Sequence, residues 1–391
     1  CKKLLALDPH ANLALDSLSK SVGVLDVLYE KIAASVSRNT ITSTHDIGRA
    51  LVALDDRPKY LEQCIGTVIK IRAQSLNEKF VNVLLHGENE GDALELNAFD
   101  SPRFLSDLLN WFFEQVILEK EFLNGRYLND IISGVEEIIS ERIQTMLSTT
   151  FNIVEIYKLS SILSFYKEKL EHSSWIQKEY NLVWSTFASA WRKRIESARL
   201  QHHQVSEKSL GPFGFLNETV FLINAILSVN DNPTILPVLA IDDLIDMCLS
   251  VSKSGLTKSQ SPVFLLNCLS SLQMALKDLF TQHQLIEEQM NVLVKDTVET
   301  VLQKVGLWDK WQLVQDNKTS DVHSLSLASN FKAFYTALFT QGIWALGNVD
   351  CLQTGALRAR ARFLVATELS TAYGDLYKEF SSIATHTPEQ V

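Results

Sequence analysis

The sequence has 391 residues, of which 46% are hydrophobic and 21% are charged, a balance typical of a folded chain that can bury large cores. Gly (15) and Pro (8) are scarce, which argues against sandwiches, barrels and β-α-β folds, because those folds need frequent turns. The formal net charge of −10 argues against nucleic-acid binding and against adhesion of the whole surface to anionic membranes, since both depend on clustered positive charge.

Long amphipathic helices dominate the hydrophobic pattern along the chain. Apolar residues recur at steps of three and four over 60–85, from Ser101 to about 123, and over 130–147, 153–170, 175–200, 216–229, 261–279, 290–305, 331–346 and 357–380. Asp100-Ser101-Pro102 predicts a helix start, because Asp caps helices and Pro suits their first turn. Lys304 followed by Gly306 predicts a helix end. No segment predicts a strand.

Polar loops separate these helices at irregular intervals, so no repeat of fixed period is present. We predict an all-α fold, arranged as an elongated rod of successive antiparallel helical bundles. The approximate bundle boundaries are 1–95, 96–205, 206–316 and 317–391.

The strongest candidate for catalysis is the run Asp242-Asp243-Leu244-Ile245-Asp246. On a helix, this spacing brings carboxylates to one face, and terpene-synthase-like all-α enzymes use it to hold Mg²⁺ against a diphosphate. The second metal-binding segment of such enzymes is matched only loosely by 230–234, which precedes the motif and lacks the closing Glu. We prefer a solvated first helical turn, where carboxylates interact favourably with the helix dipole.

Other site patterns are weaker. His202-His203 lies in a polar loop, and His283 with Glu287 supplies only two ligands. No H-E-x-x-H, G-x-S-x-G or G-x-x-x-x-G-K-[ST] occurs. We therefore predict no catalytic, cofactor-binding or metal-binding residue, and no cofactor.

Two basic clusters and two aromatic groups complete the candidates. The basic clusters are 191–199 and Arg358, Arg360 and Arg362. We interpret them as solvated helix faces with ion pairs, and contact with an acidic partner or lipid is the alternative. The aromatic groups are Trp111-Phe112-Phe113 and the pair Trp308 and Trp311, which we interpret as core packing because they lie on amphipathic seams.

The five cysteines are scattered without a C-x-x-C motif, which predicts reduced, buried thiols in a cytosolic or nuclear protein. No uninterrupted apolar stretch reaches about 18 residues, so we predict no transmembrane segment. Because the chain begins at Cys1 and not at Met, we expect a fragment of a longer protein.

Six collinear blocks, spread over residues 51–377, resemble segments of one known family. They are Leu51-Val52-Ala53-Leu54 with Pro58, Tyr60 and Cys64; 100–111 with Glu119-Lys120-Glu121; 157–160 with Phe165-Tyr166; Leu210-Gly211-Pro212 with 216–219; 304–307; and 372–377. The chain thereby resembles the C-terminal portion of the sixth subunit of the conserved oligomeric Golgi complex. Ser101 stands between Asp100 and Pro102, where that family has Asp-Pro directly, so a distant member is expected.

This resemblance implies a tethering-complex (CATCHR-like) architecture and a non-enzymatic subunit of a multisubunit Golgi vesicle tether. Such a subunit acts in retrograde intra-Golgi transport through protein–protein contacts, as a peripheral protein on the cytoplasmic face of the Golgi membrane. The implied partners are other subunits of the tether, SNAREs and Rab-type GTPases, and no nucleic acid. The resemblance also implies that the family's N-terminal coiled-coil part, expected to assemble with other subunits, lies largely outside this sequence. The sequence assigns no partner-binding residue.

Two alternatives stay open. The first is another all-α scaffold or adaptor, such as a HEAT-like solenoid, which needs repeated helix pairs of similar length. The second is a Mg²⁺-dependent all-α enzyme that uses Asp242, Asp243 and Asp246, and it requires these carboxylates to converge in a deep apolar cavity.

Overall fold

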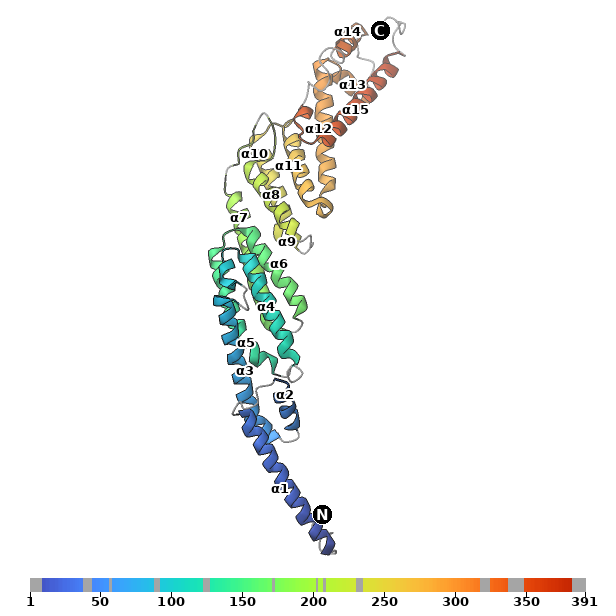
Figure 1. Cartoon of the computed structure of the whole chain (residues 1–391). Coiled ribbons are helices and arrows are strands. Elements are labelled where there is room, and N and C mark those ends of the chain that lie inside the picture. The colour runs from blue at the N-terminus through green and yellow to red at the C-terminus, as the bar shows by residue number, and fades with distance from the viewer. Residues whose placement is uncertain are drawn as a thin grey trace. The chain divides into compact units, whose positions relative to one another are not determined.

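A computed structural model describes residues 9–37, 44–55, 58–87, 92–121, 127–170, 173–201, 203–206, 209–229, 235–316, 324–336 and 348–381. Every regular element within these residues is a helix (Figure 1), which confirms the predicted all-α fold. The chain divides into two compact units, Cys1–Phe187 (unit 1) and Ala188–Val391 (unit 2). The helices in this part of the chain run from 4 to 29 residues, so they do not form the repeated pairs of a solenoid.

Unit 1 is built from long helices that pack side by side. Its elements, with η for 3₁₀-helices, are α1 (Pro9–Ser37), α2 (Thr44–Ala53), α3 (Pro58–His86), η1 (Leu94–Asn97), α4 (Ser101–Glu121), α5 (Leu128–Thr149), α6 (Ile153–Lys169) and α7 (Ser174–Arg199), which continues into unit 2. α3 packs against α5 and α1, and α4 packs against α5 and α6. The described part of unit 1 is therefore a helical bundle.

The start of α4 follows from the sequence. The Arg103 backbone N–H donates to Oδ1 of Asp100 at 3.3 Å, so Asp100 caps one of the N–H groups that the first turn leaves without a helical partner. Leu105, Leu108 and Phe112 then lie on one face, each at most 1% exposed. The capping signal thus predicted the start of α4, and helical periodicity predicted its buried face.

Unit 2 is organised around α11, whose side chains are mostly apolar and buried. The elements of unit 2 after α7 are α8 (Gly214–Val229), α9 (Leu236–Leu239), α10 (Ile241–Gly255), α11 (Ser261–Leu276), η4 (Lys277–Leu279), α12 (His283–Lys304), α13 (Trp308–Gln315), α14 (Ser324–Thr336), η8 (Asn348–Cys351) and α15 (Gly355–Ser381). α11 packs against α8, α10 and α12, and α12 packs in turn against α13 and α15.

The end of α12 confirms the predicted stop signal. Gly306 has a φ of +70°, a left-handed conformation that glycine adopts without steric cost. The chain then turns back, and the Leu307 N–H donates to the Leu302 carbonyl at 2.8 Å, as in a Schellman motif. The Asn330 side-chain amide donates to the Gly306 carbonyl at 2.7 Å, which ties α14 to this turn. The turn sets the direction of α13.

Further predictions concern the helix over 331–346, the cysteines, membrane-spanning segments and the number of bundles. The predicted helix over 331–346 corresponds to α14 up to Thr336, with Phe331 and Phe334 buried, and residues 337–347 lie outside the described residues. Three cysteines, Cys64, Cys248 and Cys268, are buried as expected, whereas Cys351 is half-buried and Cys1 lies outside the described residues. No helix among the described residues is both long and apolar enough to cross a bilayer. The division into four bundles stays a prediction.

Candidate partner-binding surface

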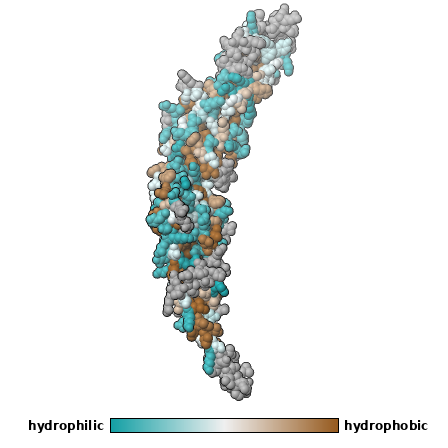
Figure 2. Space-filling view, in the orientation of Figure 1, coloured by the Kyte–Doolittle hydropathy of each residue, from teal (hydrophilic) through white to brown (hydrophobic). Residues whose placement is uncertain are grey.

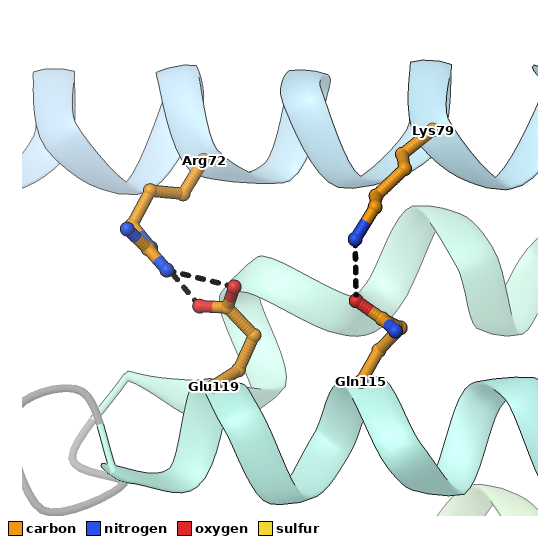
Figure 3. Close-up of polar contacts among 4 residues, drawn as sticks. All are labelled: Arg72, Lys79, Gln115 and Glu119. Atoms are coloured by element: carbon orange, nitrogen blue, oxygen red, sulfur yellow. Dashed lines mark hydrogen bonds and ion pairs between the residues drawn. The ribbon is translucent and has the colours of Figure 1, made fainter. Parts of the chain in front are cut away.

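Polar side chains that bridge α3 and α4 are satisfied within unit 1 (Figure 3). The Arg72 guanidinium donates to both carboxylate oxygens of Glu119, with Nε–Oε2 at 3.0 Å and Nη2–Oε1 at 2.8 Å. The two side chains are only 17% and 12% exposed. Two turns along, the Lys79 ammonium donates to Oε1 of Gln115 at 3.3 Å. These charges hold two helices together, so this surface does not present them to a partner.

The aspartates of 242–246 lie at the start of α10, and the structure gives each of them a surface position. Asp243 accepts an ion-paired hydrogen bond from Nη2 of Arg199 at 2.6 Å, and both side chains are 45% exposed. Asp242 is exposed and accepts from Nε2 of Gln282 at 3.1 Å, and Asp246 is also exposed. Within the described residues these carboxylates therefore lie on the surface and do not converge in the deep apolar cavity that the enzyme hypothesis requires. No group of three His, Cys, Asp or Glu residues in the described part could hold a metal ion.

The histidines singled out by the sequence take part in local contacts. The ring of His203 lies 2.8 Å from the Ala198 carbonyl through Nε2 and packs on Phe213 at 4.5 Å between centroids. His283 contacts Phe280, with centroids 5.3 Å apart. Glu287 pairs with Arg360, which lowers the pKa of its carboxyl through hydrogen bonding. His202 lies outside the described residues.

The basic clusters form ion pairs and hydrogen bonds within unit 2, as the preferred interpretation predicted. Arg358 donates to the Leu352 carbonyl through Nε and Nη2, at 3.0 and 2.7 Å. Arg362 lies on the same face of α15 as Arg358, because residues four apart share a helix face. Its guanidinium pairs with Asp350 at 2.5 Å. The first cluster behaves alike: Arg194 pairs with Glu218 at 3.1 Å, and Arg199 pairs with Asp243.

The two aromatic groups differ from each other. Trp111 and Phe112 are 6% and 1% exposed, and Trp111 packs against Phe80 at 4.9 Å between centroids, so core packing is confirmed for these two residues, whereas Phe113 is half-buried. For Trp308 and Trp311 the prediction of core packing is wrong, because both rings are half-buried and line a cleft. The periodicity of a sequence shows which face of a helix is apolar but not what covers that face. The short α13 does not have enough neighbours to cover its apolar face.

The most conspicuous candidate surface lies on α1, a helix that the sequence analysis did not single out. Val22, Val24, Leu25, Val27 and Leu28 are 44% to 61% exposed. They spread around much of the helix, and Figure 2 shows hydrophobic residues gathered along it. The sequence does contain a signal for this surface, because its apolar residues recur every one to three positions. A helix that is apolar on most sides is normally buried when it functions.

The C-terminal half of α1 explains why the exposed part is held in place. Ala33 is buried, and its carbonyl accepts from the Cys64 thiol of α3 at 3.5 Å. Tyr29 stacks on Tyr60 with centroids 6.5 Å apart. α3 therefore anchors one end of α1, and the segment that precedes the anchor offers an apolar surface to another helix.

Comparison with known proteins points to one family. The family model "Conserved Oligomeric Golgi complex subunit 6, C-terminal" matches residues 12–391. Proteins with the name conserved oligomeric Golgi complex subunit 6 are similar to this chain at 23% identity in Arabidopsis thaliana, 23% in Bos taurus and 24% in Homo sapiens. These matches cover 88%, 100% and 81% of this chain, and 66%, 69% and 56% of the respective relative. The chain thus spans between about half and just over two thirds of the length of these relatives.

Proposed function

We propose, from the premise that this chain belongs to the family of the conserved oligomeric Golgi complex subunit 6 C-terminal region, that it is a non-enzymatic subunit of a Golgi vesicle-tethering complex. It acts in retrograde transport between Golgi compartments, at the cytoplasmic face of the Golgi membrane. Its partners are other subunits of the complex, and SNAREs and Rab-type GTPases are the further partners that such a tether engages. Its parts are helical bundles, with four approximate bundles at 1–95, 96–205, 206–316 and 317–391.

The observation that carries this proposal is the exposed apolar surface of α1. A subunit of a stable complex needs an apolar surface that is exposed in the free subunit and buried in the complex, because burial of such side chains drives association. A partner helix with its own apolar seam matches α1 in shape and chemistry, as in a coiled coil. The ion pairs of Asp243, Arg360 and Arg362 within unit 2 agree with a role in which charges stabilise a scaffold.

The experiment is quantitative co-purification of the tagged chain from cells, with the other Golgi tether subunits measured by mass spectrometry. In the Leu25→Glu/Leu28→Glu variant we expect recovery of those subunits to fall at least about tenfold, because two charges are placed in an apolar contact. Glu30→Gln, an exposed polar position on the same helix, is the matched control and retains full recovery. Asp242→Ala/Asp243→Ala/Asp246→Ala also retains full recovery. Equal recovery with the charged α1 variant refutes the role of α1.

A further inference from the structure

A cleft of about 350 Å³ opens in unit 2 where α13 crosses α12 and α15. Its apolar walls are Val294 and Val298 of α12 and the rings of Trp308 and Trp311 of α13, whose centroids are 5.5 Å apart. Both valines are buried, while both tryptophans are half-buried. The Gly306 turn orients α13 so that the indoles of Trp308 and Trp311, which are three residues apart, both face α12 and α15. The volume suits one or two side chains of a partner and not a large cofactor.

The polar groups of the cleft lack partners among the residues that the structure describes. Nε1 of Trp311 is buried, and no acceptor lies near it in the described part of the chain. Asn291, Lys295 and Glu368 line the rim, with exposed side chains that make no hydrogen bond or ion pair to the described residues. Elsewhere in unit 2 the exposed charges often pair, as Arg360 does with Glu287. A buried indole N–H without an acceptor is costly, and a ligand that supplies one removes that cost.

The arrangement of charges selects the chemistry of the ligand. Lys295 on α12 attracts a carboxylate, and Glu368 on α15 attracts a basic side chain. The Trp311 N–H requires a carboxylate or carbonyl oxygen. Tryptophans in a partly desolvated pocket are typical anchors of protein–protein contacts. A protein segment with an apolar anchor between an acidic and a basic residue meets all three requirements. The phosphates of a nucleic acid or an anionic lipid would instead be repelled by the Glu368 carboxylate.

We propose that the cleft between α12, α13 and α15 is a docking site for an amphipathic helix of a partner protein. An apolar side chain of that helix inserts beside Trp308 and Trp311, an acidic residue pairs with Lys295 and accepts from the Trp311 N–H, and a basic residue pairs with Glu368. This site is separate from the α1 surface, lies in the other unit, and stands whether or not α1 assembles with other subunits.

The test uses the whole chain and a set of synthetic helical peptides of about 16 residues, long enough to present anchors at i and i+4 with flanking charged residues. The first peptide carries Leu anchors at i and i+4, with Glu before and Lys after them. The second has the anchors replaced by Ala, and the third has Glu and Lys exchanged. Binding is measured by fluorescence anisotropy and by the ¹⁵N–¹H signals of the tryptophan indoles.

We expect the first peptide to bind with a Kd of about 10–100 μM, and the other two at least about tenfold more weakly. The signal of Trp311, identified by its absence in Trp311→Phe, moves downfield when the first peptide supplies an acceptor. The charge-exchanged chain Lys295→Glu/Glu368→Lys prefers the third peptide, a reversal that a merely destabilised variant does not give. Phe363→Ala, which removes a 70% exposed aromatic of α15 outside the cleft, binds the first peptide normally.

Three outcomes overturn the proposal: equal binding of all three peptides, binding without a change in the Trp308 or Trp311 signals, or loss of binding in Phe363→Ala but not in the charge-exchanged chain. Absence of binding by any peptide, in a chain whose seven tryptophan signals show a folded protein, also overturns it. A failure of the α1 experiment leaves these readouts unchanged, so the two proposals fail separately.

Discussion

The side-chain amide of Asn267 on α11 donates to the Leu210 carbonyl at 2.9 Å, although 57 residues separate the two in sequence. The same amide donates to the Cys351 carbonyl at 3.0 Å, and its oxygen accepts from the Gln353 N–H at 2.8 Å. Asn267 is 1% exposed. One buried side chain thus satisfies three backbone groups that no helix satisfies, and it joins the loop before α8 and the segment before α15 to the central helix of unit 2.

We predict that Asn267→Ala destabilises unit 2 by about 2 kcal/mol, because the buried Leu210 carbonyl and the part-buried Cys351 carbonyl and Gln353 N–H lose their partner. Hydrogen exchange measured by mass spectrometry should show faster exchange in α11 and in peptides that cover residues 210 and 351–353. Met274→Ala, at a 69% exposed position of the same helix, is the control and should leave exchange unchanged. Equal effects of both substitutions would contradict the role of Asn267.

The Arg72–Glu119 pair supports a second prediction. Arg72→Met should lower the stability of unit 1 by about 2 kcal/mol, because it leaves a largely buried carboxylate unpaired, and Arg72→Met/Glu119→Met should recover most of this loss. Lys79→Met, which removes the part-buried neighbouring contact with Gln115 in Figure 3, should cost about 1 kcal/mol, because it removes one hydrogen bond and leaves no charge unpaired. Local exchange free energies in α3 and α4 provide the measurement. A double variant less stable than Arg72→Met would refute this account.

Glu136 on α5 gives a pH dependence. Burial raises the pKa of its carboxyl to about 7, well above the ordinary value of an unfolded chain. The folded state therefore binds more protons than the unfolded state between about pH 4.5 and 7, so stability falls as pH rises through this range. We expect the loss to be about 1 kcal/mol, since the side chain keeps part of its hydration. The difference in stability between wild type and Glu136→Gln, measured by thermal melts across this pH range, isolates this contribution. A difference that stays constant or rises with pH contradicts the prediction.

The aspartates of α10 allow a direct test of the enzyme hypothesis. If they form a solvated helix start, Mg²⁺ at millimolar concentration leaves the melting temperature unchanged, because a ligand stabilises only the state that binds it. Asp246→Ala should change stability by less than about 0.5 kcal/mol, and Asp243→Ala by less than about 1 kcal/mol through loss of its exposed pair with Arg199. A rise in melting temperature with Mg²⁺ that disappears in Asp243→Ala would restore the metal hypothesis.

The fold class and most helix boundaries could be predicted from local sequence signals. Local signals carry this information: Asp100 caps α4, Gly306 ends α12, and apolar periodicity marks buried faces such as that of Leu105, Leu108 and Phe112. These signals are local because a helix satisfies its own backbone within a few residues. The six collinear blocks likewise depend on sequence order alone.

The residues that cover each apolar face and satisfy each charge could not be predicted from the sequence, because they depend on the tertiary structure. Trp308 and Trp311 have the same spacing as core residues, yet they line a cleft, because α13 is too short to be covered on all sides. Asp243 and Arg199 are 44 residues apart, and Asn267 and Cys351 are 84 residues apart, so no local pattern could pair them. Pairing of this kind depends on which helices become neighbours, and neighbours are set by packing of the whole unit, since one helix face is compatible with many partners.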